Sequence, residues 1–348
     1  MSKQYLLDYA EFYITNVCNL NCPRCNRFNN YVFSGHYSWD EFKDEYTKWS
    51  KILDVEKIGI LGGEPFSHPD LEKWVRGIAN LWPKSKIEIV TNGTYQDKIQ
   101  DFYSILKEYN GRISLDINWH KNDRTLINEL KDSMLQGAVT ETITFNKTLW
   151  QQCYNAISGP SWPKCDTPDE FKQLPLHIQE ECSTVHNFSY DIFLDNTAYI
   201  SYRDQNNVLI AISKADYFNE PTLKFDGAEF SLYNSVPKEA LEICYSKKCH
   251  HFVDGKLYKC GPLAVLPKFL EQYDVNLTSK QRDLIESYQP AAADWSATDL
   301  DMFFKNLKTV EVIDQCSICP SKFNPVQFEA GTKKIKLTDL RKQLSNNK

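Results

Sequence analysis

Three cysteines, Cys18, Cys22 and Cys25, lie close together near the start of the chain. Residues 12–17, just before them, are aromatic and β-branched, which predicts a buried strand with the thiols on the loop leaving its carboxyl end. Structural zinc normally takes four protein ligands, whereas three cysteines on one loop can hold three irons of a [4Fe–4S] cube and leave the fourth iron open. The spacing therefore predicts a metal site that can bind a further ligand.

A second motif follows another apolar segment, residues 57–61, which runs directly into Gly62, Gly63, Glu64 and Pro65. Glycines permit close approach of the backbone, and the carboxylate of Glu64 can accept hydrogen bonds from an ammonium group. The alternative interpretation of the two motifs is a structural zinc knuckle beside an ordinary turn between a strand and a helix.

Taken together, the two motifs resemble the signature of the radical S-adenosylmethionine (SAM) superfamily. The resemblance implies that the three cysteines hold a [4Fe–4S] cluster, that the open iron binds SAM, and that residues 62–65 contact the SAM amino group. Arg24 departs from the family pattern, because the residue before the third cysteine is usually aromatic there and packs near the adenine. No residue is assigned as catalytic.

Two further strands are expected to reach the SAM pocket. The segment 86–93 resembles the third strand of the family and ends in Asn-Gly, although a simple turn explains this ending equally well. In the fourth strand, residues 112–120, polar residues alternate with apolar ones and should share one face. His120 at its end is a candidate substrate contact. The resemblance implies these SAM-pocket candidates: Thr91, Asn92, Ser114, Asp116 and Asn118.

A second group of cysteines comes near the carboxyl terminus. Cys249 and Cys260 flank a predicted hairpin with an Asp-Gly turn, so the two thiols can converge, and Cys316 and Cys319 supply a further pair. Four thiolates suit either a tetrahedral zinc or a [4Fe–4S] cluster. Cys244 is an alternative to Cys249 as a ligand.

The order of these cysteines is similar to the twitch domain, the four-ligand relative of the SPASM domain that follows some radical SAM barrels. The resemblance implies one fully ligated auxiliary [4Fe–4S] cluster on Cys249, Cys260, Cys316 and Cys319. The neighbouring pair His250 and His251 is a less favoured set of zinc ligands.

Strands and helices alternate through the first 146 residues, which predicts the α/β class. The resemblance implies a partial (β/α)6 TIM-type barrel with a small C-terminal domain of a β-hairpin and helices. We expect a radical SAM barrel over residues 1–235, an auxiliary-cluster domain over residues 236–330, and a basic helix or tail over residues 331–348. The role of residues 149–186 is not assigned.

Composition limits the partners. The net charge is −6, and no basic run would track phosphates, so nucleic acid is not expected as a partner. No signal peptide or membrane span is recognisable, and clustered cysteines in a reducing compartment are typical of metal ligands, so we expect a cytoplasmic protein.

The resemblance implies reductive cleavage of SAM to a 5′-deoxyadenosyl radical, hydrogen abstraction from a peptide or a small metabolite, and net oxidation through the auxiliary cluster. The expected electron donor is a flavodoxin or ferredoxin. One alternative is a peptide epimerase with a thiol hydrogen donor, and another is a non-catalytic zinc-binding interaction module. Candidate thiol donors are Cys153, Cys165, Cys182 and Cys244.

Overall fold

The computed structural model describes residues 4–22, 24–119, 139–145, 170, 173–174, 198–204, 206–214, 217–218, 222–226, 229–244, 246–322 and 326–327. The chain divides into two compact units: unit 1 is Met1–Val90, Glu220–Phe323 and Gly331–Lys348, and unit 2 is Thr91–Asn219 and Asn324–Ala330. Most of segment 149–186 lies outside the described residues, with Cys153, Cys165 and Cys182, as do His120 and residues 331–348. The functional division at residue 235 stays a prediction.

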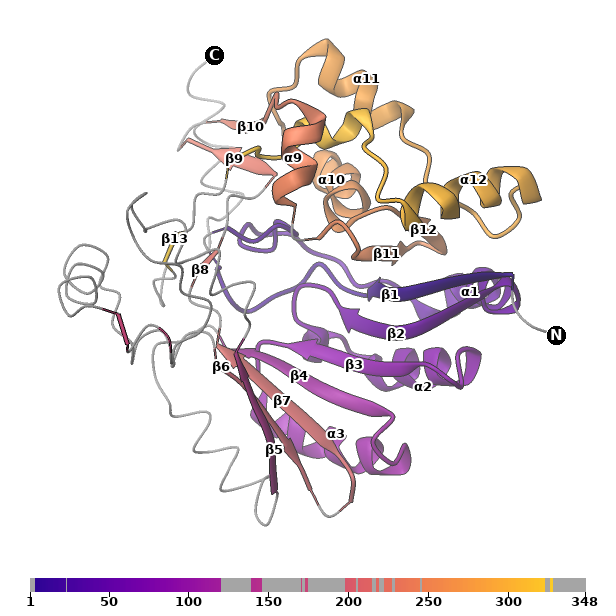
Figure 1. Ribbon diagram of the computed structural model, residues 1–348, viewed down its shortest axis with the longest axis vertical. Helices are drawn as coiled ribbons and strands as arrows, with labels where there is room; N and C mark the ends of the chain where they lie inside the picture. Colours follow the sequence, from indigo (N-terminus) through magenta and orange to yellow (C-terminus); the bar gives the residue numbers. More distant parts are fainter. Residues whose placement is uncertain are drawn as a thin grey trace. The chain divides into compact units, whose positions relative to one another are not determined.

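Unit 1 contains the first half of the predicted α/β alternation (Figure 1). Its elements are β1 (Tyr5–Tyr13), α1 (Trp39–Ile52), β2 (Leu53–Leu61), a 3₁₀ turn η1 (Pro65–Ser67), α2 (Leu71–Leu81) and β3 (Lys86–Thr91). Strands β1, β2 and β3 are parallel neighbours, and β11 (His250–Val253) pairs parallel with the other side of β1. Strand β12 (Lys256–Tyr258) closes the hairpin with β11.

The two faces of this sheet differ in chemistry. On the face covered by α1 and α2, Phe12 stacks on Phe252 at 4.7 Å and meets Trp82 edge-on at 5.5 Å. On the opposite face, Glu11 of β1 is aligned in register with His251 of β11 and with Gly59 of β2. Side chains alternate between the faces of a strand, so the apolar core and the polar row are both consequences of the period of two.

The remaining elements of unit 1 lie in its C-terminal half. They are β9 (Leu223–Phe225), β10 (Phe230–Leu232), α9 (Pro237–Ile243), α10 (Gly261–Gln272), α11 (Ser279–Ser287), α12 (Ala297–Lys308) and the 3₁₀ turn η2 (Asp314–Ile318). Phe28, Tyr31 and Phe269 belong to one buried aromatic group, which packs the segment after the first cysteines against α10. The predicted Asp-Gly hairpin turn is confirmed, with positive φ at Asp254 (50°) and Gly255 (71°).

Unit 2 contains α3 (Gln96–Glu108), β4 (Ile113–Trp119), β5 (Val139–Phe145), β6 (Ala198–Arg203), β7 (Leu209–Lys214), β8 (Tyr217–Phe218) and β13 (Val326–Gln327). Its main strands run in the order β4-β7-β6-β5. Strand β7 is parallel to β4, while β5, β6 and β7 are antiparallel neighbours. The α/β class is therefore confirmed, and the strand beside β4 is β7 and not β5, the next strand along the chain.

A tight turn explains why β7 is antiparallel to β6. The carboxylate of Asp204 accepts hydrogen bonds from the backbone N–H groups of Asn206 and Val208, at 2.9 and 2.8 Å, and Asn207 has a φ of 64°. A chain that reverses within so few residues can only place the next strand antiparallel to the previous one.

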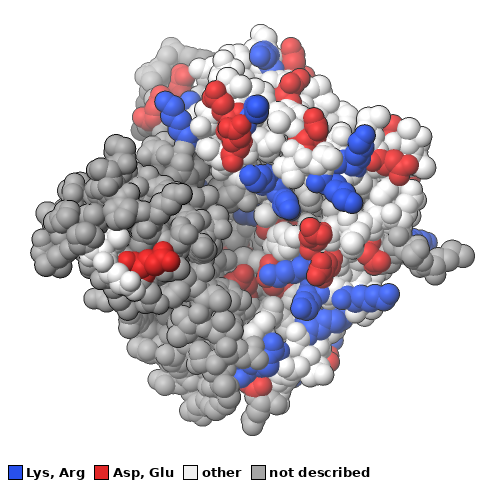
Figure 2. Space-filling view, in the orientation of Figure 1, with Lys and Arg blue, Asp and Glu red and all other residues white. Residues whose placement is uncertain are grey.

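Among the described residues, no helix is long and apolar enough to cross a membrane. On the face drawn in Figure 2, basic and acidic side chains are interspersed over the described residues.

Candidate metal centre

The cysteine loop, residues 14–28, is attached by its backbone to the end of β2. The N–H of Gly63 donates to the carbonyl of Thr15 at 2.7 Å, and the N–H of Glu64 donates to the carbonyl of Val17 at 2.8 Å. These hydrogen bonds continue the pairing of β1 with β2 up to the residue before the first thiol. The two motifs identified in the sequence are therefore neighbours in space.

Two glycines make this approach possible. A Cβ atom at Gly62 would lie 2.5 Å from the carbonyl oxygen of Thr15. A Cβ atom at Gly63 would overlap the carbonyl of Val17 and lie 2.9 Å from the Cβ of Cys18. Any side chain at either position would push the cysteine loop away from β2.

The three thiols are on a short turn and are partly exposed. The N–H of Cys25 donates to the carbonyl of Cys22 at 3.2 Å, and none of the three cysteines, including Cys18, forms a disulfide. Asn29 lies 3.8 Å from the sulfur of Cys25 and is fixed by a hydrogen bond to the hydroxyl of Tyr13 at 3.1 Å.

The donor set of the cysteine loop consists of three thiols on one partly exposed turn. In a [4Fe–4S] cube each thiolate binds a different iron, so three cysteines leave one iron open to a further ligand. The three thiols and the backbone cradle beside them fit a cluster of this kind.

Glu64 is fully buried beside the cysteine loop. Its carboxylate accepts a hydrogen bond from the N–H of Phe66 at 3.0 Å, at the start of η1. Pro65 is the first residue of this turn, and the Ser67 hydroxyl donates to the Val17 carbonyl at 3.1 Å. Both ends of this turn are thus fixed to the cysteine loop.

The predicted SAM-pocket residues at the end of β3 form a turn. Thr91 and Asn92 are buried; Thr91 Oγ1 accepts from the N–H of Gly93 at 3.1 Å, and Asn92 Oδ1 accepts from the N–H of Thr94 at 3.0 Å. Gly93 has a φ of 74°. These contacts are those of a structural turn, and the SAM-binding role of both residues stays a prediction.

The predicted polar row on β4 is present in unit 2. Ser114, Asp116 and Asn118 are partly exposed and alternate with buried apolar residues along the strand. Asn118 is paired in register with Ser213 of β7, whose hydroxyl donates to Asn118 Oδ1 at 2.7 Å. The sequence analysis missed Ser213, because β7 was not recognised as a neighbour of β4.

The second group of thiols includes both candidates for the first ligand, Cys249 and its alternative Cys244. The pKa of Cys260 is raised well above its usual value by burial and by the nearby charges of Cys319, Cys244 and Cys316. The pKa of Cys319 is raised to about 12, mainly by burial and also by Cys244 and Cys316. Burial raises the pKa of Cys249 to about 12, with further contributions from the charges of Glu11 and Cys244, while Arg27 lowers it. The electrostatic contacts of Cys260 and Cys319 are thus with Cys244 and Cys316, whereas Cys249 lies close to Glu11 and Arg27 as well as to Cys244.

Three short elements position these four thiols. Cys244 ends α9, Cys260 precedes the first residue of α10, and Cys316 lies within η2. The N–H of Cys319 donates to the carbonyl of Cys316 at 3.1 Å, and the buried hydroxyl of Thr222 lies 3.2 Å from the sulfur of Cys319. Partly buried thiols that raise one another's pKa favour a bound cation, because the cation offsets both the desolvation penalty and the mutual repulsion.

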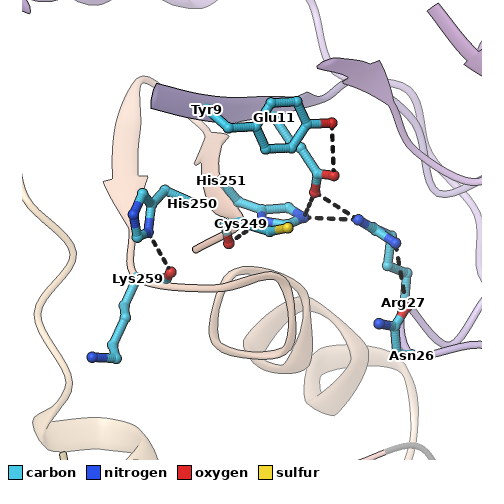
Figure 3. A network of polar contacts seen from close by, with 8 residues as sticks. All are labelled: Tyr9, Glu11, Asn26, Arg27, Cys249, His250, His251 and Lys259. Carbon is cyan, nitrogen blue, oxygen red and sulfur yellow. Dashed lines mark hydrogen bonds and ion pairs between the residues drawn. The ribbon is translucent and has the colours of Figure 1, made fainter. Parts of the chain in front are cut away.

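A buried network connects β1, the cysteine loop and β11 (Figure 3). Glu11 Oε2 is 2.7 Å from Arg27 Nη2 and 2.6 Å from His251 Nε2, and Glu11 Oε1 accepts a hydrogen bond from the Tyr9 hydroxyl at 3.1 Å. We call Tyr9, Glu11, Arg27 and His251 the Glu11 network. Burial alone would raise the pKa of Glu11, but the charges of His251 and Arg27 outweigh it and lower that pKa to about 2.

The two histidines are occupied by protein contacts. His250 Nδ1 is 2.8 Å from the carbonyl of Lys259, and desolvation by burial lowers the pKa of His250 to about 4. His251 belongs to the Glu11 network. The sequence carries a signal for this network, namely an acidic residue, Glu11, near the end of a strand whose neighbouring residues are apolar.

Residues 12–133 match the family model described as Radical SAM superfamily. The chain is 25% identical over 265 residues to a GTP 3′,8-cyclase of Aquifex aeolicus, which covers 71% of this chain and 79% of that protein. It is 28% identical over 137 residues to a GTP 3′,8-cyclase of Campylobacter jejuni subsp. doylei, covering 38% and 42%. It is 33% identical over 94 residues to a probable GTP 3′,8-cyclase of Methanococcus aeolicus, covering 25% and 31%. The last two matches span less than half of those relatives.

Two solved structures are similar to the chain at low scores. Streptococcus suis SuiB bound to S-adenosylmethionine gives 14% identity and a TM-score of 0.34 over 90% of this chain and 72% of SuiB. BtrN in complex with AdoMet and 2-DOIA gives 17% identity and a TM-score of 0.29 over 38% and 53%. These TM-scores are too low to assign a substrate.

Members of the matched family are enzymes that use SAM and a [4Fe–4S] cluster, which sets aside the alternative of a non-catalytic zinc module. The matched segment includes the cysteine loop and residues 62–65, which lie side by side in unit 1. Residues 12–133 form a radical SAM domain, and the comparisons indicate that the chain is an enzyme.

Proposed function

We propose that this chain cleaves SAM reductively and abstracts a hydrogen atom from an organic substrate. The observation that carries the proposal is the backbone pairing of the cysteine loop with Gly63 and Glu64. When bound, a [4Fe–4S] cluster supplies the electron that splits SAM into methionine and a 5′-deoxyadenosyl radical. The thiolates of Cys18, Cys22 and Cys25 would hold three irons and leave one for SAM.

The protein's own part is to bind and orient SAM. The buried carboxylate of Glu64 has acceptor capacity for the SAM ammonium, and the glycines bring backbone groups close to it. In unit 2, Ser114, Asp116 and Asn118 are proposed contacts to the SAM ribose and carboxylate. A site that excludes water also protects the radical from side reactions.

For the auxiliary cluster we propose Cys244, Cys260, Cys316 and Cys319 as ligands. The mutual effect of these four thiols on their pKa values supports this set over the one with Cys249. Full ligation by protein suits electron transfer. The substrate radical would lose one electron to this cluster and one proton to solvent, which completes a two-electron oxidation together with the abstracted hydrogen atom.

Two cysteine variants test the ligand set. Cys244→Ala is expected to reduce the iron content from about eight to about four per chain after anaerobic reconstitution, because one cube is lost. Cys249→Ala should keep about eight irons, since its thiol is outside the set. Iron loss in the Cys249 variant alone would restore the set predicted from sequence.

The substrate class is proposed as a peptide or a small metabolite, with a flavodoxin- or ferredoxin-type electron donor in the cytoplasm. A nucleoside triphosphate is a second candidate, favoured by the alignment with the Aquifex aeolicus GTP 3′,8-cyclase over 79% of that protein. Incubation of the reduced enzyme with SAM and GTP, followed by mass spectrometry, tests it: a cyclised nucleotide supports it, and unchanged GTP with continuing SAM cleavage contradicts it. Peptide epimerisation stays an alternative reaction.

SAM cleavage itself is tested by dithionite reduction and assay of 5′-deoxyadenosine. The wild-type chain should release it, and the Cys18→Ala/Cys22→Ala/Cys25→Ala variant should not. A wild-type chain that binds iron but releases no 5′-deoxyadenosine would contradict the proposed function.

A further inference from the structure

The Glu11 network lies between the two groups of cysteines and belongs to neither. Its four residues come from β1, the cysteine loop and β11, all in unit 1 (Figure 3). Glu11 is 6% exposed and His251 is 1% exposed. Burying such charged groups is costly unless they are paired, so their arrangement needs an explanation.

Arg27 extends the network into the cysteine loop. It follows Cys25 by two residues, and its two guanidinium arms point in different directions. Nη2 donates to Glu11 at 2.7 Å, whereas Nη1 donates to the side chain of Asn26 at 3.3 Å. The loop segment directly after the third thiol is therefore tied to the middle of β1.

His251 extends the network toward the second group. Its Nδ1 lies 3.3 Å from the carbonyl of Cys249. A Cβ atom at Gly261, the first residue of α10, would lie 2.8 Å from His251 Nε2, so the start of this helix packs directly on the imidazole. Gly261 directly follows Cys260. One ring thus contacts the segments that carry two different thiols.

Glu11 holds the two cationic groups in place. Arg27 Nη2 and His251 Nε2 are 3.1 Å apart, and both contact the same oxygen of Glu11. Without that carboxylate, two groups that carry or can carry positive charge would face each other in a buried site. Removing one member of a buried ion pair is strongly destabilising for this reason.

We propose that Glu11 is a positioning residue for both cysteine groups: through Arg27 it fixes the loop after Cys25, and through His251 it fixes the start of α10 after Cys260. The proposal rests on the proposed function only in assigning clusters to these thiols. The geometry it invokes is a property of the metal-free chain.

The test therefore begins with the metal-free protein. The alkylation rate of each cysteine by iodoacetamide is followed by mass spectrometry in the wild type and in Glu11→Gln. The expected result is severalfold faster alkylation of Cys25 and Cys260, with an unchanged rate at Cys316, which the network does not contact. The same variants are then reconstituted, and Glu11→Gln should retain less iron and show an altered electron paramagnetic resonance (EPR) spectrum of the reduced clusters.

Glu88→Gln is the matched control. Glu88 is also 6% exposed and lies on β3 in the same row of the sheet, and it pairs with Lys57 at 2.5 Å. It also contacts the Tyr9 hydroxyl, but its replacement leaves the contacts of Glu11 with Arg27 and His251 in place. Its removal should leave the alkylation rates of Cys25 and Cys260 at the wild-type values.

Arg27→Gln keeps the test decisive if Glu11→Gln does not fold. It removes only the arm to the loop, so Cys25 should react faster while Cys260 does not, and Arg27→Lys should restore part of the protection. Unchanged rates at both cysteines in every variant of Glu11 and Arg27 would overturn the proposal. A wild-type chain that binds no iron would remove the proposed function but leave these alkylation results interpretable.

Discussion

At the scale of single residues, the chemistry of this chain depends on side chains that contact the thiols without being ligands. Thr222 is the clearest example, because its buried hydroxyl lies 3.2 Å from the sulfur of Cys319. If Cys319 is a thiolate, the Thr222 hydroxyl must donate the hydrogen bond, because a thiolate has no proton to donate. Hydrogen bonds to the sulfurs are among the factors that set the potential of an iron–sulfur cluster.

Thr222→Val is therefore expected to lower the midpoint potential of the auxiliary cluster. The reduced cluster carries the greater negative charge, so losing a donor to its sulfur destabilises the reduced state more than the oxidised state. A redox titration monitored by EPR measures this potential. Thr222→Ser keeps the hydroxyl and should stay close to the wild type; equal potentials in all three proteins would show that the contact has no such role.

Glu11 predicts a dependence of stability on pH. Its pKa is lowered from 4.5 to about 2 in the folded chain, so its stabilising contribution is complete above pH 4.5 and is lost as the pH falls toward 2. The shift corresponds to about 3 kcal/mol of unfolding free energy. Urea unfolding of metal-free wild type and Glu11→Gln should give a difference that shrinks over this range. A difference independent of pH would contradict the assigned ionisation.

At the scale of elements, the decisive contact is between the cysteine loop and the end of β2. It consists of backbone groups, so no choice of side chain in the loop can replace it. Gly63 permits it, because the Val17 carbonyl occupies the space that a Cβ atom would need. The loop and the Gly-Gly-Glu-Pro segment thus act as one structural element.

Gly63→Ala should displace the cysteine loop and lower the iron bound by Cys18, Cys22 and Cys25 while the auxiliary site keeps its iron. Gly77→Ala on α2 is the matched control, because a Cβ atom there would overlap the Trp39 ring in the helix layer, away from the thiols. Both variants should be less stable by roughly 1–3 kcal/mol, in the range of overpacking. Iron analysis separates them: equal iron loss in both would mean that the effect is general instability.

The sequence allowed the elements themselves to be predicted wherever the pattern is local. The predicted strand segments 57–61, 86–93 and 112–120 coincide with β2, β3 and β4, and the hairpin of β11 and β12 follows from its Asp-Gly turn. The first predicted segment, 12–17, lies too late in the chain, because β1 begins at Tyr5 and ends at Tyr13. What could not be predicted depends on pairing between distant segments. The place of β7 beside β4 brings Ser213 to Asn118, and no local pattern encodes it.

The proposed choice of Cys244 over Cys249 depends on the same kind of information. Both precede the hairpin, and their spacings to Cys260 are similarly plausible in sequence. The two thiols differ in their place in the fold. Cys244 ends α9, which contacts η2, whereas Cys249 directly precedes β11 and lies close to Glu11. Residue spacing alone does not predict such tertiary contacts.

At the scale of the whole molecule, unit 1 gathers two thiol groups and a buried ionic network from segments more than two hundred residues apart in the chain. Each thiol group must hold one cluster, and the two clusters must be of different kinds. The loop cluster must have an iron open to SAM, whereas the auxiliary cluster must have none.

EPR of the reduced protein with and without SAM tests this requirement most directly. The measurement is made on the reconstituted Cys260→Ala/Cys319→Ala variant, in which only the loop cluster remains. The account predicts a [4Fe–4S] signal that changes when SAM is added, because SAM binds the open iron, and that is absent when Cys18, Cys22 and Cys25 are also replaced by alanine. A cluster signal indifferent to SAM, or no cluster on the loop at all, would contradict the account.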